Sequence, residues 1–162
     1  MKRDDPYVML AMLVRQEQLL QFDAFDSDIA LEIGLRLVRA ARAADEAITV
    51  DITRHDQRLF HHAMNGTPAD HAHWIWRKSN LVKRSGHSSC YVHTQVTMGG
   101  GAIHAIPTLD ARRFAALGGA FPLTLRGSGV VGAITVAGLP GGEDHALVVR
   151  VLRDYLRIDE SL

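Results

Sequence analysis

Cysteine and lysine are scarce in this chain, and each shortage excludes certain kinds of site or partner. Cys90 is the single cysteine among 162 residues, so no internal disulfide and no cysteine-built zinc cage can form. This cysteine usage is typical of a reducing compartment, and we expect a cytoplasmic protein. Lysine occurs only three times, and eighteen basic residues balance eighteen acidic ones. Without a basic excess the composition argues against nucleic acid as the main partner and against a polybasic membrane anchor.

Long apolar runs are also missing. No stretch approaches the ~18 apolar residues that a transmembrane helix needs, so we expect no membrane partner. Asp4, Asp5 and Pro6 stand where a secretory signal would place its apolar core, so we expect no signal peptide. The hydrophobic share of 47% and the charged share of 22% are near the globular average and exclude wholesale disorder. The length predicts one domain over residues 1–162.

The hydrophobic pattern predicts helices at both ends and in the middle of the chain, with strands between them. Alternation at 48–53 predicts a strand with one buried face, and 130–137, apolar on both faces, predicts a central strand. Thr67 and Pro68 predict the start of a helix, as a cap and a first helical residue. The full set comprises helices at 7–21, 28–44, 68–84, 88–96 and 143–156, strands at 48–53, 57–64, 120–125 and 130–137, a short strand at 102–106 and a helical turn at 110–117.

This order of elements predicts the fold class. Neighbouring strands in hairpins favour a mostly antiparallel sheet, and the helices must then cover its faces. We therefore expect an α/β protein of the α+β type, built as an α-β-α layered single domain.

The chain has nine histidines, a number that raises the question of a metal site, but their positions in the sequence argue against one. His71 and His73 are two residues apart on a predicted helix, so their side chains diverge by about 200°. His61 and His62 are neighbours on a predicted strand and face opposite sides, which favours one partly buried ring and one surface ring. We expect no metal.

The single cysteine permits a nucleophilic pair only in principle. His93 follows Cys90 by three residues, close enough to touch on a helix. No orienting third group is evident, and a buried, inert thiol explains the residue better.

The loop that begins at Gly138 leads from a predicted strand into a predicted helix. It superficially resembles a phosphate cradle, but Glu143 and Asp144 open the helix and would repel an anion from its positive end. No GxGxxG or GxxxxGK[ST] pattern is present. Asp144 can cap the helix, or it can join His145 in orienting a small ligand or in acid–base catalysis.

A second glycine corner precedes the strand at 120–125. Gly118 and Gly119 allow unusual backbone angles, and Pro122 after Phe121 implies an edge strand or a bulge. The corner serves either tight packing or a backbone-lined pocket. Lys78 stands among apolar residues on one face of a predicted helix, where it can extend to solvent or point into a cleft.

Several of these segments together resemble a known family. The similarity lies in Gly118–Pro122, in Gly129–Pro140, in Glu143–His145 and, more weakly, in Trp74, Lys78, Ser88 and Ser89. Over about residues 26–157 the chain resembles the haem-degrading-domain superfamily of HbpS/GlcG-like proteins, and it is most similar to the branch of short cytoplasmic members. The resemblance implies a profilin- or PAS-like layout, homo-oligomers and, for some members, bound haem. It leaves residues 1–25 as an N-terminal helical extension.

Three functions follow as hypotheses. The first is a cytosolic homo-oligomer that binds a small molecule or a protein partner without catalysis. The second is a haem-binding or haem-handling protein, with haem as its cofactor. The third is a hydrolase-like enzyme that uses Asp144 and His145. The predicted ligand pocket comprises Lys78, Gly118, Gly119, Phe121, Pro122, Gly138, Asp144 and His145.

Overall fold

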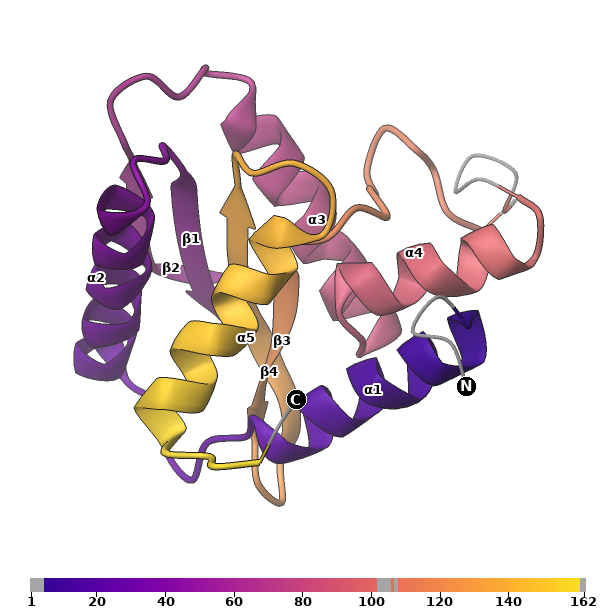
Figure 1. The fold of residues 1–162 in the computed structure, drawn as a ribbon, viewed down its shortest axis with the longest axis horizontal. Coiled ribbons are helices and arrows are strands. Elements are labelled where there is room, and N and C mark those ends of the chain that lie inside the picture. Colours follow the sequence, from indigo (N-terminus) through magenta and orange to yellow (C-terminus); the bar gives the residue numbers. More distant parts are fainter. Residues whose placement is uncertain (1–4, 102–105, 107, 161–162) are drawn as a thin grey trace.

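A computed structural model describes residues 5–101, 106 and 108–160, and these contain five helices and four strands (Figure 1). The elements are α1 (Pro6–Leu19), α2 (Ser27–Ala43), β1 (Thr49–Arg54), β2 (Gln57–Ala63), α3 (His71–Ser85), α4 (Ser89–Met98), β3 (Ala120–Leu125), β4 (Gly129–Ala137) and α5 (Glu143–Leu156).

The four strands form one sheet in the order β2-β1-β4-β3, and every neighbouring pair is antiparallel. β1 and β2 form the predicted hairpin, whose two connecting residues His55 and Asp56 have φ of 47° and 64°. Two left-handed residues in a two-residue connection match the twist of the paired strands. β4 is central, as its apolar character predicted, and Pro122 lies in the edge strand β3.

Helices cover both faces of the sheet. α2 and α5 lie on one face, where Leu37 and Leu152 are fully buried against strand residues such as Val50 and Ile134. α3 covers the other face, where Val82 packs on small side chains of β3 and β4. The predicted α+β class and α-β-α layering are confirmed.

The N-terminal helix is attached at one side of this body. α1 packs against α4 (Figure 1). Phe22, the third residue after α1, pairs with β3, since its amide donates to Thr124 O and its carbonyl accepts from Arg126 N, both at 2.9 Å. This single bridge covers part of the otherwise open edge of β3. Among the described residues no helix is long and apolar enough to cross a membrane.

Some sequence expectations are wrong. β1 is buried on both faces, because on its polar face Thr49 contacts His71 of α3 and Asp51 is covered by Arg58 and His61 of β2. α3 begins at His71 rather than at Pro68, since the Thr67 hydroxyl donates to Met64 O and closes a turn instead of capping the helix. Residues 110–117 form turns without a helix. The strand expected at 102–106 lies almost wholly outside the described residues.

Candidate functional site

A cavity of about 390 Å³ opens where α3 meets the end of β4 and the start of α5. The glycine corner before β3 and the glycine loop after β4 form part of its wall, so two segments that the sequence singled out separately lie side by side. The cavity is lined by Pro68, Asp70, His71, Trp74, Lys78, Leu117, Gly118, Ala137, Gly138, Leu139, Gly141 and Asp144.

Lys78 forms the polar base of this cavity. Its side chain is only 4% exposed, and its ammonium group donates to Val136 O at 2.6 Å, Gly118 O at 3.0 Å and Asp144 Oδ2 at 3.3 Å. These three acceptors use all three N–H groups of a protonated lysine. Burial lowers the pKa of Lys78, and the carboxylate of Asp144 counteracts that shift.

Asp144 completes the pair from the first turn of α5. Oδ1 accepts a hydrogen bond from Leu139 N at 2.9 Å, which ties the glycine loop to the helix, while Oδ2 faces Lys78. Burial raises the pKa of Asp144, and Lys78 opposes the rise. The residue does not cap α5 as expected, because Gly142 occupies that position and no side chain caps the helix.

Two glycines allow the backbone to approach this ion pair. Gly119 has φ of 123°, and a β-carbon there would lie 2.3 Å from Val136 O and 2.6 Å from Lys78 Nζ. Gly138 has φ of 141°, and its β-carbon would lie 2.6 Å from Ala47 O. Any side chain at either position would collide with backbone, so the predicted need for glycine has a direct cause.

Other residues that line the cavity carry groups that can meet a ligand. The indole of Trp74 donates to Asp70 Oδ2 at 2.7 Å and is covered by the Arg77 guanidinium 4.7 Å from its ring centre. Nδ1 of His71 lies 3.2 Å from the Thr49 hydroxyl. The site thus combines an aromatic ring, an imidazole and a carboxylate above a hydrogen-bonded ion pair.

The structure brings together part of the predicted pocket. Lys78, Gly118, Gly138 and Asp144 line the cavity, and Gly119 lies directly behind Lys78. The other three do not line it: Phe121, Pro122 and His145, of which Phe121 and His145 are buried against each other with ring centres 5.9 Å apart.

His145 faces away from Asp144. Its Nε2 lies 2.8 Å from Gln16 Oε1 on α1, and its Nδ1 is buried without a partner among the described residues. Burial lowers the pKa of His145 to about 4, so the ring is neutral near pH 7. The two side chains therefore occupy separate environments and do not form the expected acid–base pair.

The structure also shows the surroundings of several other histidines and of the cysteine. His93 Nδ1 lies 2.8 Å from Ala116 O, and burial raises the pKa of the Cys90 thiol, which suits an inert cysteine. The side chain of His61 is 31% exposed and its Nδ1 lies 2.8 Å from the buried Asp51, whereas His62 is exposed, so one ring is partly buried and one lies on the surface as expected. Over the part of the chain that the structure describes, no three such side chains are placed to hold a metal.

Sequence reasoning did not include Asp70 in the predicted pocket, and it also left out His71 and Trp74. The signal that could have found them is the helical spacing of 71, 74 and 78, which places His71 and Trp74 on the same face of α3 as Lys78. Gln16 was also missed, and no local pattern marks it, because its partner is 129 residues away.

The comparisons with known proteins agree with the resemblance. The sequence model of the family described as haem degrading protein HbpS-like matches residues 25–153. The chain belongs to the HbpS-like family. That match spans the whole sheet and all the residues that line the cavity.

Individual HbpS-like relatives and solved structures extend the match. The chain is 42% identical to the UPF0303 protein SCO2848 of Streptomyces coelicolor, over 91% of this chain and 93% of that protein. It is similar to the crystal structure of the Ybr137w protein, with a TM-score of 0.84, 25% identity, and 91% and 87% of the two chains covered. The PduOC:heme complex shares the fold, with a TM-score of 0.65, 14% identity, and 80% and 93% covered.

Proposed function

We propose that this HbpS-like protein binds a small organic molecule in the cavity between α3, β4 and α5, without turning it over. The observation that carries the proposal is the Lys78–Asp144 pair. A buried ion pair is costly to desolvate, and here it stiffens the base of an open cavity while every N–H of Lys78 is already engaged. A lysine held in this way supports a binding surface rather than acting as a nucleophile.

A ligand in this cavity is detected through Trp74. The chain has two tryptophans, and Trp76 is 47% exposed outside the cavity, so Trp76→Phe leaves Trp74 as the only indole. We expect a saturable change in the fluorescence of that variant with some members of a panel of small organic acids, amides and cofactors.

Leu117 offers a matched pair of variants. It is 46% exposed at the cavity, and Leu31, 49% exposed on α2, lies outside it. In the Trp76→Phe background, Leu117→Arg should weaken binding at least about tenfold by crowding the cavity, whereas Leu31→Arg should not. No saturable ligand, or equal effects of both variants, would contradict the proposal.

Haem is the second candidate ligand. The family is described as haem degrading, the PduOC:heme complex shares the fold, and His71 supplies an imidazole in the cavity wall. Absorbance titration with haem should give a saturable Soret shift that His71→Ala removes. His73→Ala is the control, because His73 is exposed and stacks on Trp76 outside the cavity. Unsaturable uptake, or the same shift in both variants, would leave the site to another ligand.

We further propose that the protein works as a homo-oligomer in the cytosol. The single cysteine supports the compartment, and the first half of α1 supports self-association, since Tyr7 is 74% and Met12 is 38% exposed. Light scattering should show a multiple of the 17.8 kDa chain that Tyr7→Glu with Met12→Glu reduces. A monomer in both cases would contradict self-association.

A further inference from the structure

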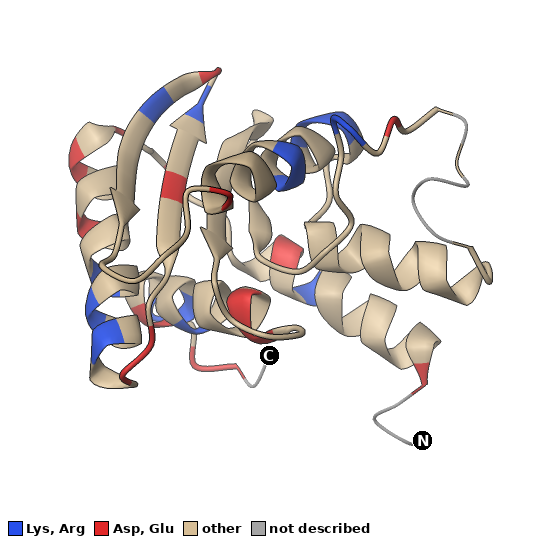
Figure 2. Cartoon of the chain, turned by 90° about the horizontal axis from the view of Figure 1, so that it is seen from above, with Lys and Arg blue, Asp and Glu red and all other residues tan. Residues whose placement is uncertain are grey.

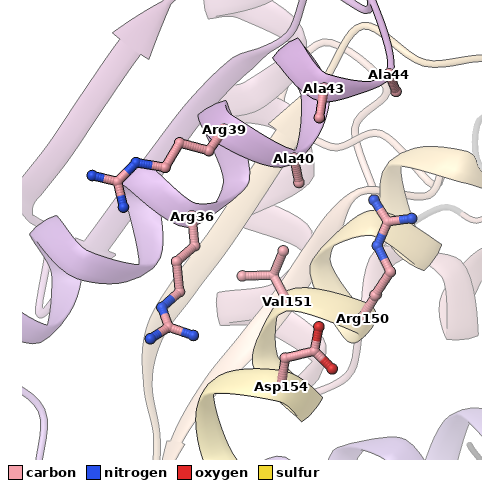
Figure 3. A pocket seen from close by; sticks show the side chains of 8 residues that line it. All are labelled: Arg36, Arg39, Ala40, Ala43, Ala44, Arg150, Val151 and Asp154. Carbon is pink, nitrogen blue, oxygen red and sulfur yellow. The ribbon is translucent and has the colours of Figure 1, made fainter.

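A second concave surface lies on the opposite side of the sheet, between α2 and α5. It is a groove of about 490 Å³ whose lining comes from the C-terminal half of α2 and the middle of α5. Figure 3 shows Val151 between the side chains of Arg36 and Arg150, with Ala40 beside it. The full lining is Arg36, Arg39, Ala40, Ala43, Ala44, Arg150, Val151 and Asp154.

Two arginines without a partner among the described residues, Arg39 and Arg150, line this groove. In a chain with no net charge, most arginines of the described residues are engaged by a carboxylate, a carbonyl or an aromatic ring. Five side chains have no such partner among the described residues, namely those of Arg39, Arg42, Arg84, Arg150 and Arg157. All but Arg84 belong to α2 or to the end of the chain from α5 onward, and Figure 2 shows α2 changing from acidic near its start to basic near its end.

One arginine of the groove is already positioned. Arg36 Nε donates to Glu32 Oε1 at 2.6 Å, and its guanidinium lies 5.4 Å from the centre of the Tyr155 ring. Both contacts leave its terminal N–H groups free for another acceptor within the described region. A guanidinium held in this way loses less conformational entropy when it binds a carboxylate than a free side chain does.

The shape and charge of the groove select the kind of partner. The groove receives its positive charges from both helices, Arg36 and Arg39 from α2 and Arg150 from α5, so these charges are distributed along its walls and not gathered at one point. The exposed carboxylate of Asp154 also lines the groove and repels a compact anion or a continuous phosphate backbone, but it can accept a peptide N–H. The alanines of α2 let a chain segment approach the helix closely.

We propose that the groove between α2 and α5 docks an acidic segment of a partner protein, with alternate carboxylates on the arginines and its backbone over the alanines and Val151. This surface is separate from the ligand cavity, because α2 and α5 cover the sheet face opposite to α3. The proposal is therefore independent of the proposed function.

Fluorescence anisotropy with a short dye-labelled peptide tests the proposal. The peptide carries glutamate at every second position, and a peptide with glutamine in those positions is its control. We expect saturable binding of the glutamate peptide alone, weakened by added salt because exposed charges are screened. Arg39→Gln with Arg150→Gln should weaken binding by about five- to tenfold, as expected for two exposed ion pairs. Arg84→Gln with Arg113→Gln changes the net charge equally on another surface and should leave binding unchanged.

Four outcomes would overturn the proposal. The first is no difference between the two peptides, and the second is equal loss of binding in both double variants. The third is displacement of the peptide by inorganic phosphate or by oligothymidylate at comparable charge concentration, which would assign the groove to a small anion or to nucleic acid. The fourth is a change in particle mass by light scattering in Arg39→Gln with Arg150→Gln alone, which would show that a second copy of the chain covers the groove.

Discussion

The two faces of the central sheet are built from different chemistry. Toward α2 and α5 the buried side chains of β1 and β4 are apolar, and Val50, Ile52, Ile134 and Val136 are all fully buried. Toward α3 the same two strands present buried polar residues, which are Thr49, Asp51, Thr53 and Thr135. The cross-strand pairs keep the two sets apart, since Val50 faces Val136 and Asp51 faces Thr135.

The two faces therefore contribute differently to stability and to the ligand cavity. The apolar face contributes stability through burial, at about 25 cal/mol per Å² of apolar surface removed from water. The face toward α3 forgoes part of that stabilisation, and one of its polar residues, Thr49, contacts His71 in the wall of the ligand cavity. Polar groups that are fixed in a dry environment are what an orienting binding site needs.

The largest effect on the free energy of unfolding is expected at the buried Lys78–Asp144 pair. Lys78→Met leaves Asp144 buried without its counter-ion and should lower the free energy of unfolding by about 3–5 kcal/mol. Urea denaturation measures the loss. Lys78→Met with Asp144→Leu removes both charges and should be closer in stability to the wild type than Lys78→Met alone. If the single variant costs less than about 1 kcal/mol, the pair is not coupled and the polar base of the cavity is not a structural unit.

How far sequence reasoning reached differs between the two faces as well. The apolar face was predictable from two patterns. Alternation of apolar and polar residues predicted the strands of the hairpin, and the run at 130–137, apolar on both faces, predicted the central strand. The face toward α3 was not, because alternation in Thr49, Asp51 and Thr53 has the same pattern whether the polar side meets water or a helix. Only the placement of α3, which the sequence does not encode locally, decides between the two.

In the candidate site, too, some features could be predicted from the sequence and others could not. Gly119 and Gly138 could be singled out because positive φ and close backbone approach leave a local mark in the sequence. The Lys78–Asp144 contact spans 66 residues and could not be derived from spacing. For the same reason the sequence left open whether Asp144 caps the helix or joins His145, and its partner Lys78 lies on another element.

The next largest effect on stability is expected from His145, a polar side chain that is buried beside the apolar face. His145 is neutral in the folded state with a pKa near 4, against 6.5 when exposed, so the unfolded state binds the extra proton. Its contribution is complete above pH 6.5 and is lost as the pH falls toward 4, at ~1.4 kcal/mol per pH unit and about 3 kcal/mol in all. His145→Gln should flatten this part of the stability profile, whereas His73→Gln on the exposed surface should not. Parallel profiles for the wild type and His145→Gln would show that the imidazole titrates freely and is not buried.

The smallest expected effects come from exchanging threonine and valine at two neighbouring positions of β4, one on each face of the sheet. The Thr135 hydroxyl is buried without a hydrogen-bond partner among the described residues, so Thr135→Val should raise the free energy of unfolding by about 1 kcal/mol. Its neighbour Val136 faces the apolar side, and Val136→Thr buries a new hydroxyl there and should lower it by about 1–3 kcal/mol. Thermal or urea unfolding of the two variants decides the sign. Destabilisation by Thr135→Val would mean that the hydroxyl has a partner, such as a buried water, and that the polar face is a satisfied network like the ion pair beside it.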